Sequence, residues 1–252
     1  ASILASRFNP IGEYIRAWNK NSSFPDTRGI SIIDTMMNLP LLYWNSNETN
    51  DPRFKQIAIK HADTTMRYFA RPDGSVNHVV EFNPNDGSLL TSHGGQGYEL
   101  GSSWSRGQAW GIYGFILSYI HTGNAEYLDT AKRIAHYFIS CVSGDFITKL
   151  DFRAPAEPYY LDNTASAIAA CGLIEIGNHV DACEKDLYLN AALKLLQVLD
   201  KTDIDWSEET DNLLTKCSAK YHEKEHHYSI IYGDSFFMEA IFKLRGNDVF
   251  MW

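Results

Sequence analysis

The stretch WSRGQAWGIYGFILSYI, residues 104–120, combines polar and aromatic groups with the start of a long apolar helix, which we expect over 106–121. Trp104 and Trp110 bracket Arg106 near the helix start. An arginine fork binds a carboxylate through two parallel hydrogen bonds, and tryptophan faces stack on sugar rings. Together they predict a ligand that is both sugar and acid, a uronic acid. The alternative is a buried helix start whose arginine pairs with a neighbouring Asp or Glu.

Helical periodicity dominates the rest of the chain. Asp51-Pro52 is a typical helix start, and Asn124 and Asp162 are placed to cap two further helices. The segments from Thr49 to Phe69 and from Thr122 to Phe138 resemble each other weakly, as equivalent helices of successive hairpins do. We therefore expect helical hairpins arranged in a ring or solenoid. The expected helices are 30–43 (with Pro40 as a kink or break), 52–70, 106–121, 125–142, 163–177, 185–200 and 234–245.

The segment 71–103 interrupts this pattern. Residues 76–82 alternate loosely like a short strand, and an Asn-, Gly- and Ser-rich loop follows. A long structured insert between two helices of a compact domain is usually functional. Because no linker or break in composition divides the chain, we expect residues 1–252 to form one domain.

The composition excludes several partners. A net charge of −9 argues against nucleic acid and anionic membranes, so an acidic substrate needs a local basic group such as Arg106. No apolar run approaches the length of a membrane span. The four cysteines have no CxxC or metal-ligand spacing, which favours thiols in a reducing compartment and leaves a disulfide open: Cys141, Cys171, Cys183 and Cys217.

Asp34 is the second informative residue, because it lies among Ile32, Ile33, Met36 and Met37. A carboxylate in such surroundings has to be paired, face a cavity or carry a proton. An aspartate that faces a cavity or carries a proton is suited to act as a general acid. The alternative is an aspartate that caps a helix or binds backbone amides.

Seven segments, in this order, resemble one known family. They are RAWN (16–19), IIDTMMNLPLLYW (32–44), HVVEFNP (78–84), GQGY (95–98), WSRGQAWGIYGF (104–115), DNTASAIAACGLIEI (162–176) and YGDSFFMEAIFKL (232–244). Together they resemble the unsaturated glucuronyl hydrolases of glycoside hydrolase family 88, from near residue 1 to the C-terminus.

The resemblance implies an all-α fold, the (α/α)6 toroid, with the active site in its central pocket. It also implies removal of the 4,5-unsaturated uronic acid that polysaccharide lyases leave on glycosaminoglycan-type oligosaccharides. An aspartic acid protonates C4 of the vinyl ether, water adds to C5, and the hemiketal collapses. This chemistry differs from that of two-carboxylate glycosidases and implies no metal or organic cofactor.

Position by position, the resemblance makes Asp34 the catalytic acid/base. It implies substrate contacts for Trp18, His78, Gln96, Arg106 and Trp110. His78 and Gln96 keep a structural alternative, and Trp104 is either pocket wall or core. Ser218 and Lys220 lie where relatives contact substrate sulfates, with an ordinary exposed loop as the alternative.

The chain also departs from the family pattern. Relatives are longer, so we expect this chain to lack the first helical hairpins and a second pocket aspartate, and to be marginally stable alone. Gly95 stands where relatives often have histidine, and Leu100 replaces an acidic residue. Two other functions stay open, an unsaturated rhamnogalacturonyl hydrolase and an inactive sugar-binding protein. Cysteine usage favours the cytoplasm, and a lost leader would favour the periplasm.

Overall fold

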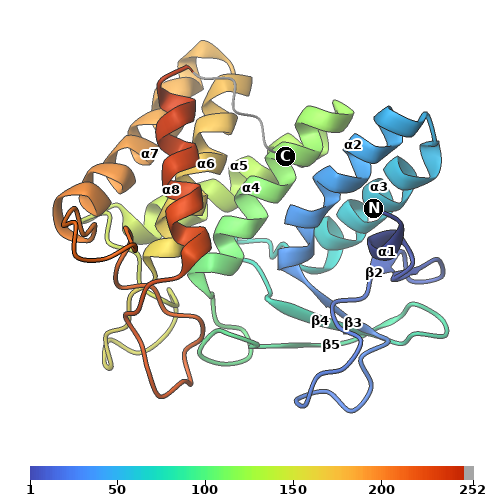
Figure 1. The fold of residues 1–252 in the computed structure, drawn as a ribbon. Coiled ribbons are helices and arrows are strands. Elements are labelled where there is room, and N and C mark those ends of the chain that lie inside the picture. Colours follow the sequence, from blue (N-terminus) through green and yellow to red (C-terminus); the bar gives the residue numbers. More distant parts are fainter. Residues whose placement is uncertain (247–252) are drawn as a thin grey trace.

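The computed structural model describes residues 1–246, and helices dominate it (Figure 1). The helices are α1 (Ser2–Ala5), the 3₁₀ helix η1 (Ile33–Asn38), α2 (Leu39–Thr49), α3 (Pro52–Tyr68), α4 (Ser105–Thr122), α5 (Ala125–Val142), α6 (Asn163–His179), α7 (Ala182–Thr202) and α8 (Ile231–Leu244). The strands are β1 (Phe8–Asn9), β2 (Tyr14–Ile15), β3 (Ile30–Ile32), β4 (Val79–Phe82) and β5 (Leu89–His93).

The long helices form two rows. Helices α2, α4, α6 and α8 pack side by side in an inner row, and α3, α5 and α7 each pack on the helix before them. Helices α4 and α6 are buried along nearly their whole length. Apart from a few buried polar groups such as Arg106 and Gln108, their residues are mostly apolar or small, as a helix covered on every side requires. The loops and the β-sheets gather at one end of this arrangement (Figure 1).

Two of the predicted helix caps are confirmed. The Asp51 side chain accepts a hydrogen bond from the Arg53 amide, and Asn124 accepts one from the Glu126 amide. Asp162 stands at the N-cap position of α6 but makes no side-chain cap hydrogen bond. Its carboxylate is used elsewhere, as described below.

The prediction of one helix over 30–43 is wrong in its first part. Ile30–Ile32 forms strand β3, the 3₁₀ helix η1 follows, and α2 begins only at Leu39. Pro40 therefore lies in the first turn of α2, where its missing N–H is harmless, and it neither kinks nor breaks a helix. The cause is tertiary, because β3 pairs antiparallel with β4, Ser31 opposite Val80.

The interrupting segment 71–103 contains two strands where the sequence predicts one. Strand β4 confirms the prediction over its last four residues, whereas β5 lies in the stretch that we expect to be loop. The sheet has the order β3-β4-β5, and all its pairs are antiparallel. Strand β5 is an edge strand with mostly exposed side chains, so it lacks the apolar alternation that marks a half-buried strand.

All four cysteines are free thiols in the structure, and Cys171 and Cys217 are buried. Among the described helices, none has the length and apolar character needed to cross a bilayer.

A buried histidine joins the N-terminal segment to α3. His61 is fully buried, and its Nδ1 accepts a hydrogen bond from the Ile15 amide at 3.0 Å. An imidazole ring nitrogen can accept only when it carries no proton. Burial accordingly lowers the pKa of His61 from its ordinary value of 6.5 to about 3.

We expect this histidine to make stability depend on pH. Between pH 6.5 and about 3, His61 is protonated in the unfolded chain but not in the folded one. The contribution of neutral His61 to the free energy of unfolding is therefore complete above pH 6.5 and is lost as the pH falls. The free energy of unfolding should drop by about 1.4 kcal/mol per pH unit from this group. Urea titrations at pH 7.5, 6 and 5 measure the slope, which should be shallower in His61→Asn. An equal slope in both proteins would show that His61 protonates without unfolding.

Candidate active site

The candidate site lies where the N-terminal ends of the inner helices come together. Asp34 is in η1, directly before α2; Arg106 is in the first turn of α4; and Tyr232 is in the first turn of α8. Asp162 is the N-cap residue of α6. Helix N-termini carry unpaired N–H groups and a partial positive charge, which favours anions. The architecture therefore suits an anionic ligand.

Strand pairing brings Asp34 and His78 together. Asp34 follows β3 by two residues and His78 directly precedes β4, and the antiparallel ladder ends with the Ile33 amide donating to the His78 carbonyl at 3.0 Å. The His78 Nε2 and Asp34 Oδ2 atoms are 3.3 Å apart. Both atoms are buried and make no aligned hydrogen bond within residues 1–246, although the Asp34 side chain as a whole is 29% exposed. Asp34 is thus partly exposed, with one buried oxygen held beside an imidazole.

The loop before α4 fixes the tautomer of this imidazole. The Gln96 amide donates to His78 Nδ1 at 2.8 Å, so the neutral ring carries its proton on Nε2, facing Asp34. Gly95 makes this contact possible. Its φ is +62°, and a Cβ there would lie 2.1 Å from His78 Nδ1. The glycine that departs from the family pattern is therefore the residue that lets His78 take this position.

A buried aspartate organises the same loop. Asp151 accepts hydrogen bonds from the amides of Tyr98 and Ser103, both at 3.0 Å, and from the Arg153 amide at 2.9 Å. This arrangement leads the chain into α4 with Trp104 at the N-cap position. The Trp104 ring is 2% exposed and lies 4.4 Å from the His78 ring, centroid to centroid. Trp104 therefore belongs to the buried layer behind the site.

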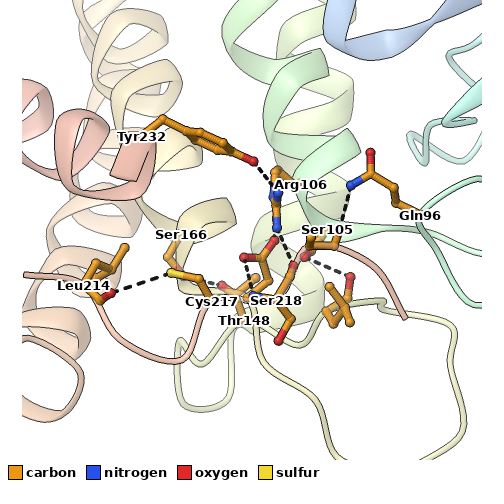
Figure 2. A network of polar contacts seen from close by, with 12 residues as sticks. Gln96, Ser105, Arg106, Thr148, Ser166, Leu214, Cys217, Ser218 and Tyr232 are labelled. Carbon is orange, nitrogen blue, oxygen red and sulfur yellow. Dashed lines mark hydrogen bonds and ion pairs between the residues drawn. The ribbon is translucent and has the colours of Figure 1, made fainter. Parts of the chain in front are cut away.

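Arg106 is 1% exposed and has three intramolecular partners, drawn in Figure 2. Its Nε donates to Asp162 Oδ2 at 2.8 Å, Nη1 donates to the Tyr232 hydroxyl and Nη2 to the Ser218 carbonyl. Burial is the largest single effect on Arg106 and lowers its pKa, but the charge and hydrogen bond of Asp162, with Tyr232 and Asp34, together raise the pKa by more. The structure thus contains the ion pair that the sequence offers as the alternative for Arg106, and direct contact with an anionic sugar stays a prediction.

Tyr232 is a further residue of the site, and it has no local sequence signal beyond its place at the start of the segment 232–244. Its hydroxyl accepts from Arg106, and its ring lies 6.2 Å from that of Trp110. Because the hydroxyl accepts from Arg106, its own proton is left for another acceptor. Burial raises the pKa of Tyr232 and Arg106 lowers it; the net change is upward, with the charge of Asp34 contributing to the rise. The residue as a whole is 36% exposed.

A pocket of about 750 Å³ opens beside this cluster. It is lined by Trp18, His78, Gln96 and Lys220, four of the residues that the resemblance implies. Trp18 stacks on Phe24 with 5.7 Å between ring centroids, and Phe24 contacts His93 edge to face at 5.0 Å. These rings form an aromatic wall, which suits the C–H faces of sugars.

The lining leaves out the other predicted residues: Asp34, Trp104, Arg106, Trp110 and Ser218. Trp110 is 8% exposed and packs against Phe236 as well as Tyr232. Ser218 is fully buried, and its hydroxyl accepts from the His227 amide at 3.1 Å. Lys220 lines the pocket but forms an ion pair with Glu223 at 3.4 Å. The Gln96 side chain donates to the Ala219 carbonyl at 2.7 Å and so joins the loop before α4 to the loop before α8 (Figure 2).

No protein-family model matches the sequence. An unsaturated glucuronyl hydrolase of Bacillus sp. (strain GL1) is 36% identical over 260 residues, which cover 100% of this chain and 68% of that protein. An unsaturated chondroitin disaccharide hydrolase of Streptococcus pyogenes serotype M1 is 31% identical over 248 residues, covering 96% of this chain and 62% of that protein. This chain thus spans roughly two thirds of their length.

The fold has solved counterparts. The chain superposes on a structure of unsaturated glucuronyl hydrolase with dGlcA-Glc-Rha-Glc at a TM-score of 0.90 and 36% identity, covering 96% of this chain and 66% of that one. These hydrolases are α/α toroids, which confirms the predicted fold class.

Proposed function

The chain belongs to the unsaturated glucuronyl hydrolase family, and on that premise we propose that it takes part in removing a 4,5-unsaturated uronic acid from the non-reducing end of an oligosaccharide. The observation that carries the proposal is the Asp34–His78 pair beside the pocket, with its buried Oδ2–Nε2 separation of 3.3 Å. The relatives that match the chain are named for this activity, or for hydrolysis of unsaturated chondroitin disaccharides.

Asp34 supplies the proton in the proposed reaction. Because the Nε2 proton of His78 lies on the side of Oδ2, 3.3 Å from it, we place the acidic proton of Asp34 on Oδ1. That proton passes to C4, the C4=C5 electron pair forms the new C–H bond, and C5 becomes an oxocarbenium ion. Water adds to C5 and gives its proton to Asp34, which restores the acid. The hemiketal then collapses, opens the ring and releases the remaining sugar.

His78 acts as a positioning residue in this scheme. Its Nε2 lies 3.3 Å from Oδ2, one of the two oxygens that share the negative charge when Asp34 gives up its proton. A nearby N–H dipole attracts a charged carboxylate more strongly than a neutral carboxyl group, so this arrangement favours proton release. Because the Gln96 amide donates to Nδ1, the proton of the neutral ring stays on Nε2.

We propose that Tyr232 meets the substrate carboxylate and that Arg106 acts through it. The buried guanidinium polarises the hydroxyl by donating to it, and the phenolic proton then points to the ligand. Trp110, packed on Tyr232, would cover the ring of that sugar.

Loss of the C4=C5 chromophore provides the test of the function. An unsaturated chondroitin disaccharide is incubated with the 252-residue chain and with a form extended by the N-terminal hairpins that the resemblance implies. Decay of ultraviolet absorbance in either form supports the proposal. Absence of decay on every unsaturated glucuronide with folded protein, and decay on an unsaturated rhamnogalacturonan disaccharide, would favour the related hydrolase.

Tyr232→Phe should lower kcat/KM about tenfold or more, since a hydrogen bond to a charged group is lost. The loss should be smaller on the methyl ester of the same substrate, whose carboxyl group is uncharged. Tyr159→Phe is the matched control, because Tyr159 is similarly exposed and contacts Lys149 instead of Arg106. Equal losses on the acid and on the ester would contradict the assignment of Tyr232 to the carboxylate.

The compartment stays a proposal. Four free thiols favour the reducing cytoplasm.

A further inference from the structure

A half-buried arginine lies behind the Asp34–His78 pair. Arg71 comes three residues after the end of α3, and with His78 and Trp104 it borders a narrow space in the structure. Burial, and next the charge of Arg153, lower the pKa of Arg71, yet arginine keeps its charge in proteins. A cation in such surroundings costs free energy unless its N–H groups are hydrogen-bonded, so the acceptors of this guanidinium are informative.

The Arg71 guanidinium joins two segments of the chain. Its Nη2 donates to the carbonyls of Val76, at 2.7 Å, and of Ser102, and its Nη1 donates to the Gly101 carbonyl at 2.6 Å. Val76 lies two residues before His78, in the segment that leads into β4, whereas Gly101 and Ser102 lie in the loop before α4. All three acceptors are backbone oxygens, so Arg71 holds the main chain of one segment against that of the other.

The loop before α4 is held near both of its ends against the segment that contains β4. The β4–β5 ladder fixes the start of the loop, where His93 lies opposite Val79. Arg71 fixes the other end at Ser102. Gln96 lies between these two points, so the position of its amide relative to β4 depends on both of them.

The link between Ser102 and Val76 runs through Arg71 itself, since one nitrogen, Nη2, donates to both carbonyls. Gly101 has a second donor, Arg153 Nη1 at 2.9 Å, and keeps it when Arg71 is replaced. A substitution at Arg71 should therefore loosen the loop against the segment before β4 without releasing the loop altogether.

We propose that Arg71 is a positioning residue for His78. The Gln96 amide donates to His78 Nδ1 at 2.8 Å, and this contact needs the loop before α4 and the segment before β4 to keep their relative position. The planar guanidinium fork of Arg71 holds that position, which keeps the proton of the neutral ring on Nε2, on the side of Asp34. The inference rests on the proposed function, in which this proton lies beside the catalytic acid.

Arg71→Lys tests the proposal, because lysine keeps the charge but lacks the planar fork that joins the two segments. The parent and the variant are labelled at the histidine nitrogens, and nitrogen chemical shifts at a pH where imidazole is neutral show which ring nitrogen carries the proton. Loss of one set of signals in His78→Gln identifies His78. The parent should show the Nε2–H tautomer alone, and Arg71→Lys should show both tautomers.

Turnover is measured by chromophore loss on the same proteins and on their N-terminally extended forms. In Arg71→Lys kcat should fall about tenfold with little change in KM, as expected when a group beside the reacting atoms is misplaced. Arg67→Lys is the matched control, because Arg67 is exposed in the last turn of α3 and contacts the Tyr68 ring. It should change neither the tautomer of His78 nor kcat.

Arg71→Gln is neutral and also lacks the fork, so it should behave as Arg71→Lys does, and it takes the place of that variant if the lysine protein does not fold. A folded Arg71 variant in which His78 keeps one tautomer would overturn the inference, because an arginine needed only for stability leaves the ring unchanged. A parent with the His78 proton on Nδ1 would overturn it as well. Two tautomers in the variant, with no turnover by the parent in either form, would support the inference and count against the proposed function.

Discussion

Asp34→Asn should reduce turnover of the unsaturated disaccharide by at least about a hundredfold, the usual contribution of a general acid–base group. Asparagine has the same shape and can still accept the His78 Nε2–H, but it has no proton to give to C4. Substrate affinity should therefore change little, and the loss should appear in kcat. Initial rates of chromophore decay across a range of substrate concentrations separate the two parameters.

Asp129→Asn is the control for this variant, because Asp129 lies exposed on α5, away from the pocket. It should retain the full rate. An Asp34→Asn protein that keeps a tenth or more of the parent rate would assign the proton to another group. Equal unfolding curves for the two variants would ensure that a lost rate reflects chemistry.

Asp162→Asn should destabilise the chain by about 3–5 kcal/mol, the effect of removing one partner from a buried ion pair. Asp162 is fully buried and Arg106 is 1% exposed, so no water can replace the missing charge. The asparagine oxygen can still accept from Nε, but the guanidinium charge is left without compensation. Urea unfolding followed by circular dichroism measures the loss, and a drop of this size is a large part of the stability of an ordinary domain.

Asp181→Asn provides the comparison, because Asp181 is also an N-cap residue without a side-chain cap hydrogen bond, at the start of α7. Unlike Asp162 it is exposed. Its substitution should change the free energy of unfolding by less than about 0.5 kcal/mol. If both variants unfolded at the same urea concentration as the parent, the Arg106–Asp162 pair would contribute nothing to stability.

The sequence predicts most of the long helices well, because their apolar periodicity and, in two cases, their capping residues are local features that the folded structure keeps. Helix α3 follows an Asp-Pro start, and α5 follows an asparagine cap. It predicts β3 and β5 poorly for the opposite reason. Residues 30–32 continue an apolar run into a helix, and 89–93 are mostly exposed, so only pairing with β4 makes either one a strand.

The candidate site shows the same division. Asp34 and Arg106 attract attention because charged groups in apolar surroundings need a partner or a task. Their partners are distant in sequence: His78 lies 44 residues from Asp34, and Tyr232 lies 126 residues from Arg106. No local pattern indicates such pairs. Asp162 lies both at the start of α6 and beside the buried Arg106 of α4. This second neighbour exists only because α4 and α6 pack together.

The N-termini of the inner helices lie at one end of the structure, so the opposite end contributes no residue to the candidate site. The turns there join α2 to α3 through Asn50, α4 to α5 through Gly123, and α6 to α7 through Val180. A linker, fluorophore or surface anchor attached at the exposed Ala125, beside the αL turn at Gly123, would leave the loop-bearing end facing solution. The protein can thus be immobilised on a support through this end, with the candidate pocket presented to the medium.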